Sequence, residues 1–247
     1  MSSPLLYRKR LINQINNPEH HIIYIYGPAG FGKTILAQHW MDSQDLPTAW
    51  IEGFSTTNAN ELFQDFLKKI YETLPNLKTK LKPLLSLKSV SIDNIKALSQ
   101  ILESDKTPFN VVVDNAEEIR REHNDLSVAL VGLMPRHIKL VLLTSTSPST
   151  EFMKGAGINR FAVIGAEELR FTKDETKQLV TEVIPNITES EIKEVLDITE
   201  GWPTITGVLI SLLKANQEFR NQLSNLKLKG KPQLSIEAKR VLSKLTL

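Results

Sequence analysis

The chain has 247 residues, 41% hydrophobic and 23% charged, with a formal net charge of +2, as expected of a globular protein of one or two domains. The balanced charge argues against nucleic-acid binding by this segment, and the absence of cysteine excludes disulfides and thiolate metal sites. No apolar run reaches the roughly 20 residues that span a membrane, and charges at 8–10 rule out a signal core, so we expect a cytoplasmic protein without membrane contact.

The N-terminal part alternates predicted helices and strands. Residues 5–16 carry apolar side chains at helical spacing, and the β-branched and aromatic run at 22–26 predicts a buried strand. Residues 34–41 are composed of good helix formers. A second strand is expected at 48–51, and Asn58 is expected to cap a strongly amphipathic helix.

Between the first strand and the following helix lies the run Gly-Pro-Ala-Gly-Phe-Gly-Lys-Thr, which fits G-x-x-x-x-G-K-[ST] at every fixed position. A glycine-containing turn with a chance lysine is the alternative, but the flanking strand and helix both favour a phosphate loop. Lys33 would reach the β- and γ-phosphates, and the Thr34 hydroxyl would hold Mg²⁺. The predicted nucleotide-binding residues of the loop are Gly27, Pro28, Ala29, Gly30, Phe31, Gly32, Lys33 and Thr34.

Further alternation follows in the middle of the chain. Residues 75–90 predict a loop with a short helix, and two longer helices are expected at 92–103 and 125–134. Three more strands are expected, at 109–114, 138–144 and 161–164. Alternating strands and helices imply an α/β fold, with a parallel sheet between two helical layers as in P-loop NTPases.

A phosphate loop needs an acid at the end of another strand to order Mg²⁺. Asp114 ends the strand at 109–114, about 80 residues after Lys33, which leaves room for another strand between these two in the sheet. We expect Asp114 to act in catalysis and, with Thr34, to hold the metal. The alternative is a strand-end aspartate that only starts a turn.

Hydrolysing P-loop ATPases often place a second acid directly after the first. Here that residue is Asn115, which can orient a water molecule but cannot accept its proton. Glu117 and Glu118 could supply the catalytic carboxylate, or could be ordinary surface residues. Thr144 ends the strand at 138–144 in a polar cluster without arginine, and we expect it to sense the γ-phosphate.

From residue 168 onward the predicted strands stop. Four helices are expected, at 174–184, 188–199, 204–215 and 217–226. We therefore expect a nucleotide-binding domain at 1–167, a helical lid at 168–228 and a linker with a further segment at 229–247. The lysines at 227–233 could touch phosphates, but a solvated linker fits their composition better.

These pieces resemble the nucleotide-binding region of the signal-transduction ATPases called STAND, and within them the MalT-like transcriptional regulators of the LuxR family. The resemblance extends over about Leu5 to Leu226. Besides the phosphate loop, it is carried by 37–40, 48–51, 71–75, 169–175 and Glu200-Gly201-Trp202-Pro203. It implies an ASCE-type sheet with a helical lid and ATP or ADP with Mg²⁺ between them. It also implies that Pro203 sits against the base or ribose of ADP in the resting form, although Gly201-Trp202-Pro203 could be a simple helix–helix corner.

This sequence departs from the family pattern in two places. The family commonly has two adjacent acids where this chain has Asp114-Asn115, and the MalT-like branch commonly has an arginine near the position of Thr146. We therefore expect slow ATPase activity at most. Family members continue into winged-helix, sensor-repeat and often DNA-binding domains, and 236–247 resembles the start of a winged helix. The chain is thus expected to be a fragment or a natural short relative.

Our first hypothesis from the sequence is a regulatory nucleotide switch. ADP would hold the protein closed and monomeric, and ATP would open it for self-association, with downstream sensor and effector domains as partners. The alternative is an actively hydrolysing AAA-like motor or remodelling factor, which would need a competent base and an arginine finger. A nucleic-acid-binding module is a third possibility, which the balanced charge disfavours.

Overall fold

The computed structural model describes residues 6–53, 59–87, 89–116 and 124–215. The chain forms two compact units. The α/β unit comprises residues 9–29 and 33–166, and the helical unit comprises the described parts of 1–8 and 167–247 together with Gly30–Gly32. The N-terminal segment and Gly30–Gly32 thus belong with the C-terminal helices, which the sequence pattern does not predict.

The α/β unit contains a five-stranded parallel sheet with the strand order β2-β3-β4-β1-β5. The strands are β1 (Ile22–Tyr26), β2 (Thr48–Glu52), β3 (Phe109–Asp114), β4 (Ile138–Thr144) and β5 (Phe161–Ile164). As the sequence spacing allows, β4 lies between the phosphate-loop strand β1 and the Asp114 strand β3. This topology confirms the predicted fold class, a three-layer P-loop NTPase sheet of the ASCE type.

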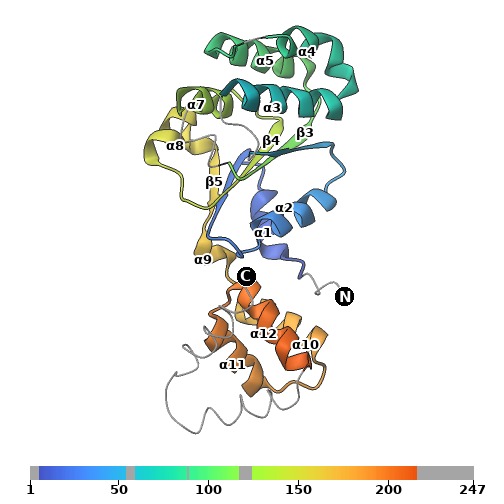
Figure 1. Ribbon diagram of the computed structural model, residues 1–247, viewed down its shortest axis with the longest axis vertical. Coiled ribbons are helices and arrows are strands. Elements are labelled where there is room, and N and C mark those ends of the chain that lie inside the picture. Colours follow the sequence, from blue (N-terminus) through green and yellow to red (C-terminus); the bar gives the residue numbers. More distant parts are fainter. Residues whose placement is uncertain (1–5, 54–58, 88, 117–123, 216–247) are drawn as a thin grey trace. The chain divides into compact units, whose positions relative to one another are not determined.

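Helices cover both faces of this sheet. Helices α3, α7 and α8 lie on one face, and α1 and α2 lie on the other (Figure 1). Helices α4 and α5 pack against α3 and α7. The helices of this unit are α1 (Lys9–Ile15), α2 (Lys33–Asp42), α3 (Ala59–Thr73), α4 (Lys78–Leu85), α5 (Ile92–Asp105), α7 (Asn124–Gly132) and α8 (Thr150–Ala156), with 3-10 turns at Pro75–Leu77 and Ile158–Arg160.

The strands are nearly continuous apolar runs because both faces of the sheet are buried. In β1, Ile22 and Tyr24 join the core beneath α3, while Ile23 and Ile25 alternate with them and are also fully buried. All six residues of β3 are buried, including Asn110, whose side-chain amide donates to the Thr48 hydroxyl of the neighbouring β2 at 3.5 Å. The polar side chain at this position therefore has a partner within the sheet.

Helix α8 was not predicted from the sequence. It is a seven-residue helix, too short to show a convincing apolar period, and it contains a glycine. Its start is set by Ser149, whose hydroxyl accepts from the N–H of Phe152 at 3.2 Å, and Gly157 ends it at φ +94°. Phe152 and Ala156 anchor it in the core. The capping residues Ser149 and Gly157 are therefore the local sequence signal that could have identified this helix.

The helical unit has its own apolar core. Its helices are α9 (Ala166–Leu169), α10 (Lys173–Val183), α11 (Glu189–Thr199) and α12 (Pro203–Ala215). Capping boxes start α10 and α11, and Leu6 from the N-terminal segment joins the core that these helices share with α12. The helices predicted at 174–184, 188–199 and 204–215 are confirmed. The predicted helix at 217–226 and the segment 229–247 lie outside the described residues.

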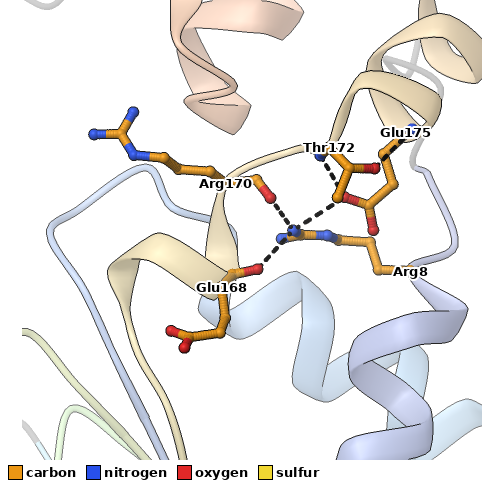
Figure 2. Close-up of polar contacts among 5 residues, drawn as sticks. All are labelled: Arg8, Glu168, Arg170, Thr172 and Glu175. Atoms are coloured by element: carbon orange, nitrogen blue, oxygen red, sulfur yellow. Dashed lines mark hydrogen bonds and ion pairs between the residues drawn. The ribbon is translucent and has the colours of Figure 1, made fainter.

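Arg8 ties the N-terminal segment to the start of α10 (Figure 2). One nitrogen of its guanidinium donates to the carbonyls of Arg170 at 2.9 Å and Glu168 at 3.4 Å, and lies 3.5 Å from the Glu175 carboxylate. The guanidinium also lies over the ring of Phe171, 4.9 Å from its centroid. Because the Arg8 side chain is only 5% exposed, these contacts fix the N-terminal segment within the helical unit.

A basic cluster holds the edge of the sheet where the parallel strands begin. Arg160, just before β5, donates to the carbonyls of Gly132 and Met134 and to Nε2 of His21. Lys139 donates to the carbonyls of Ile15, Asn17 and His20 at 2.7–2.9 Å. Burial, then the positive charge of Arg160, lowers the pKa of His21 to about 4, so this ring is neutral and accepts from the guanidinium.

Candidate functional site

The phosphate loop joins β1 to α2. Gly30 has φ +80° and Gly32 has φ +76°, a left-handed conformation that glycine adopts without strain. Such turns at a helix N-terminus point successive backbone N–H groups into one concavity, which suits an anion. The backbone of the predicted loop therefore fits the phosphate-binding role that the motif indicates.

The Lys33 ammonium lies back over the beginning of this loop. It donates to the carbonyl of Gly27 at 2.7 Å and to that of Pro28 at 3.2 Å. These two carbonyls are hydrogen-bond partners that a phosphate oxygen could replace at modest cost, because the ammonium keeps its charge and has three donors. The position of Lys33 at the start of α2 is consistent with the predicted contact to the β- and γ-phosphates.

Thr34 and Asp114 come together although they are 80 positions apart. The Thr34 hydroxyl donates to Oδ2 of Asp114 at 2.9 Å. Asp114 ends β3 and is only 8% exposed, and its other oxygen accepts from the N–H of Asn115 at 2.9 Å. A hydroxyl and a carboxylate side by side are the hard oxygen ligands that Mg²⁺ prefers. The pair therefore fits the metal that the sequence analysis assigned to it.

Asn115 has a left-handed backbone, with φ +56°. Asparagine tolerates this region better than most residues with a side chain. The end of β2 approaches closely here: the Gly53 N–H donates to the carbonyl of Asp114 at 2.9 Å, and a Cβ on Gly53 would lie 2.6 Å from the carbonyl oxygen of Asn115. Glu117 and Glu118, the predicted catalytic carboxylates, lie outside the described residues.

Thr144 ends β4 next to the phosphate loop. Its backbone carbonyl accepts from the Gly27 N–H at 3.2 Å, so the two strand ends are tied together. Its buried hydroxyl donates to the carbonyl of Thr146 at 2.6 Å. To donate to a γ-phosphate, the hydroxyl would have to leave this turn. The sensing role of Thr144 stays a prediction.

The tip of the phosphate loop, Gly30–Gly32, belongs to the helical unit and contacts the start of α12 there. The Gly30 carbonyl accepts two hydrogen bonds from Thr204, from its N–H at 3.1 Å and from its hydroxyl at 2.8 Å. The Phe31 ring packs against Trp202 with 5.2 Å between centroids, and the Arg170 guanidinium lies 5.7 Å from the Phe31 centroid. The sequence analysis missed Thr204 and Arg170, because nothing local to either marks a partner so distant in the chain.

Pro203 is the first residue of α12, where proline fits the helix start. A Cβ on Gly32 would lie 3.9 Å from Cβ of Pro203, so the proline is next to the loop. Gly201 supplies the preceding corner: it has φ +72°, and a Cβ there would lie 2.4 Å from the carbonyl oxygen of Phe171. The segment is thus a helix–helix corner that also brings Pro203 beside the phosphate loop.

Other site types find no support within the described ranges. These contain no group of three or more histidine, aspartate or glutamate side chains that could hold a metal ion. No helix described in the structure is long and apolar enough to cross a membrane. The phosphate loop with Asp114 is therefore the site on which a function can be argued.

Comparison with known protein families identifies a family for the N-terminal part of the chain. Residues 8–143 match the family model described as an AAA ATPase domain. No curated protein sequence matches the chain.

Solved structures resemble the chain in fold. One is a STAND protein with a tetratricopeptide repeat sensor from Pyrococcus horikoshii, with 19% identity, a TM-score of 0.60, and coverage of 83% of this chain and 30% of that one. Another is a Walker-type ATPase of Pyrococcus abyssi, with 15% identity, a TM-score of 0.57, and coverage of 98% of this chain and 77% of that one. The chain thus spans under a third of the length of the first of these proteins.

Proposed function

Because the chain belongs to the AAA ATPase domain family, we propose that it binds ATP and ADP at the 27–34 loop and acts as a regulatory nucleotide switch. In this proposal the loop N–H groups and Lys33 hold the phosphates. Thr34 and Asp114 hold Mg²⁺, which neutralises phosphate charge when bound. Their hydrogen bond of 2.9 Å supports a preformed site.

One observation carries the switch part of the proposal. The start of α12 contacts the tip of the phosphate loop through Trp202 and Thr204, and Pro203 lies beside Gly32. Because Gly30–Gly32 belong to the helical unit, a phosphate held by their N–H groups would be held by backbone that the start of α12 contacts. A ligand shifts an equilibrium between two states only by contacting them differently, and ADP and ATP can differ in their contacts with Pro203.

The wider role follows from the resemblance of the sequence to MalT-like regulators. We place the chain in a cytoplasmic transcriptional regulator, where ADP favours a closed monomer and ATP favours self-association. Sensor and effector domains would supply the signal and the output. The similar protein from Pyrococcus horikoshii is described as carrying a tetratricopeptide repeat sensor, and by analogy we propose a sensor partner for this chain.

The second candidate is an actively hydrolysing AAA-like motor or remodelling factor. The family match and the complete Thr34–Asp114 pair favour it. Against it, the residue after Asp114 is an asparagine, which cannot take a proton from the attacking water. Slow hydrolysis suits a switch, because each nucleotide state must last long enough to be read.

The experiment that tests the switch is a pair of titrations on Pro203→Ala. Calorimetric titration should show ADP affinity falling by more than ATP affinity, because Pro203 contacts the nucleotide in the closed, ADP-bound form. Pro75→Ala is the matched control, since Pro75 also begins a helical turn and lies in the α/β unit far along the chain from the loop. Its affinities for both nucleotides should equal those of the wild type.

Equal losses of ADP and ATP affinity in Pro203→Ala, or no loss, would refute the ADP-clamp role. The affinities can be interpreted only if Pro203→Ala is folded. The circular dichroism spectrum and the unfolding midpoint of the variant show whether it is folded. If Gly201-Trp202-Pro203 is a corner alone, Pro203→Ala changes only the unfolding midpoint.

A further inference from the structure

The carbonyl of Gly30 acts as a cap for helix α12. The first N–H groups of a helix have no partner inside it, and Trp202, which precedes α12, has no side-chain oxygen to accept from them. The Thr204 N–H and hydroxyl instead both donate to Gly30 O, at 3.1 Å and 2.8 Å. The two residues are 174 positions apart in the sequence. A phosphate-loop carbonyl thus satisfies the start of a helix in the C-terminal part of the chain.

This contact fixes the orientation of one particular peptide. The Gly30 carbonyl and the Phe31 N–H belong to the same planar trans unit and therefore point in opposite directions. With the carbonyl turned toward Thr204, the Phe31 N–H is turned away from α12. It lies between the two left-handed glycines, in the stretch whose N–H groups would cradle phosphate.

Packing holds the same peptide from its other end. The Phe31 side chain is only 4% exposed and lies against the Trp202 ring at 5.2 Å between centroids. A Cβ on Gly30 would lie 2.8 Å from the Thr204 hydroxyl and 3.2 Å from Nε1 of Trp202. Position 30 is one that the G-x-x-x-x-G-K-[ST] pattern leaves open, and its glycine allows this close approach.

We infer that Thr204 is a positioning residue of the nucleotide site: it holds the Gly30–Phe31 peptide so that the Phe31 N–H faces the bound phosphates. The inference rests on the proposed nucleotide binding and adds a route by which the helical unit sets phosphate affinity. This route is independent of Pro203, which would act on the base or ribose. It acts on ADP and ATP alike, because both present a diphosphate to the loop.

The test compares removal of the Thr204 hydroxyl with removal of the Thr206 hydroxyl, two residues further along α12. In Thr204→Val the hydroxyl bond to Gly30 is lost while the side-chain shape is kept, and ADP affinity should fall about two- to tenfold. Thr204→Ser keeps a hydroxyl and should bind ADP like the wild type. The control is Thr206→Val, which removes a 2.8 Å hydroxyl bond to the Trp202 carbonyl within α12, and it should leave ADP affinity unchanged.

Inorganic pyrophosphate supplies a readout that helix stability alone would not move, because it carries neither base nor ribose. In protein labelled with ¹⁵N-phenylalanine, the Phe31 amide resonance, assigned through Phe31→Leu, should shift as pyrophosphate is added. Thr204→Val should weaken the pyrophosphate response by the same factor as ADP binding. Thr206→Val should leave the response at its wild-type concentration midpoint.

The outcomes separate this inference from the proposed function. If Lys33→Ala weakens ADP binding while Thr204→Val binds ADP and pyrophosphate like the wild type, the positioning role is overturned and nucleotide binding stands. Equal losses in Thr204→Val and Thr206→Val also overturn it, because helix stability would then be the cause. A wild-type protein that binds neither ADP nor ATP overturns both.

Discussion

At the scale of single residues, Asn115 connects backbone geometry to turnover. Its φ is +56°, so the position suits residues that tolerate a left-handed backbone. Aspartate is among them, whereas glutamate is not favoured there. A carboxylate at this position is therefore better tested with Asn115→Asp than with Asn115→Glu.

We predict that the wild type releases phosphate from ATP well below the ~10 s⁻¹ typical of enzymes, because Asn115 cannot serve as the base. Asn115→Asp should raise this rate. Phosphate release at saturating ATP measures it, and the double variant Asn115→Asp, Lys33→Ala should lose the gain. A robust wild-type rate that falls in Glu117→Gln or Glu118→Gln would place the base on one of those glutamates instead.

Some residues of the site could be predicted from the sequence and others could not. The phosphate loop and Asp114 could be predicted because strand, turn and helix chemistry are local and the acid ends a recognisable strand. Thr204 and Arg170 could not, since their partners Gly30 and Phe31 lie far away in the chain and only folding brings them together. The close approach of Gly53 to the backbone of Asn115 likewise joins the ends of two different strands, which local sequence does not reveal.

At the scale of elements, periodicity predicted the five strands and the longer helices well. It failed for α8 and α9, which have seven and four residues and are too short to show a helical period. It also could not assign the segment around Arg8 to the helical unit. That assignment depends on carbonyls of residues 168 and 170, which carry no side-chain signature.

The cluster of His21 and Arg160 at the beginning of the sheet predicts a pH dependence of stability. The pKa of His21 is lowered to about 4 in the folded protein, from 6.5 in the unfolded chain, first by burial and then by Arg160. The unfolded chain therefore binds the proton more readily, and folding stability falls as pH drops from 6.5 toward 4. By pH 4.5 this one group should cost roughly 2 kcal/mol of unfolding free energy.

Urea unfolding of the wild type and His21→Gln at pH 7 and pH 4.5 measures this contribution. Glutamine keeps an oxygen that can accept from Arg160 but does not titrate in this range, and all other groups are common to both proteins. The wild type should lose the larger free energy between the two pH values. Parallel losses would show that the His21 ring does not control acid stability.

At the scale of the whole molecule, the chain consists of two compact units whose division passes through the phosphate loop itself. Ala29 and Lys33 belong to the α/β unit, and Gly30–Gly32 belong to the helical unit. Within the helical unit, Gly30 contacts Thr204 and Phe31 contacts Trp202, so the loop backbone at 30–31 is held by the start of α12. The whole proposal depends on one contact, the binding of a nucleoside diphosphate to the loop through Lys33.

Calorimetric titration of ADP with Mg²⁺ into the wild type and Lys33→Ala tests that claim most directly. Loss of a charge-assisted contact worth about 1.5–3 kcal/mol should weaken ADP binding roughly ten- to a hundredfold. Lys96→Ala is the matched control, because Lys96 is exposed on α5 beside Asp93 and its loss removes the same charge. We expect wild-type affinity for Lys96→Ala and the large loss for Lys33→Ala, whereas equal ADP affinity in all three proteins would refute nucleotide binding through Lys33.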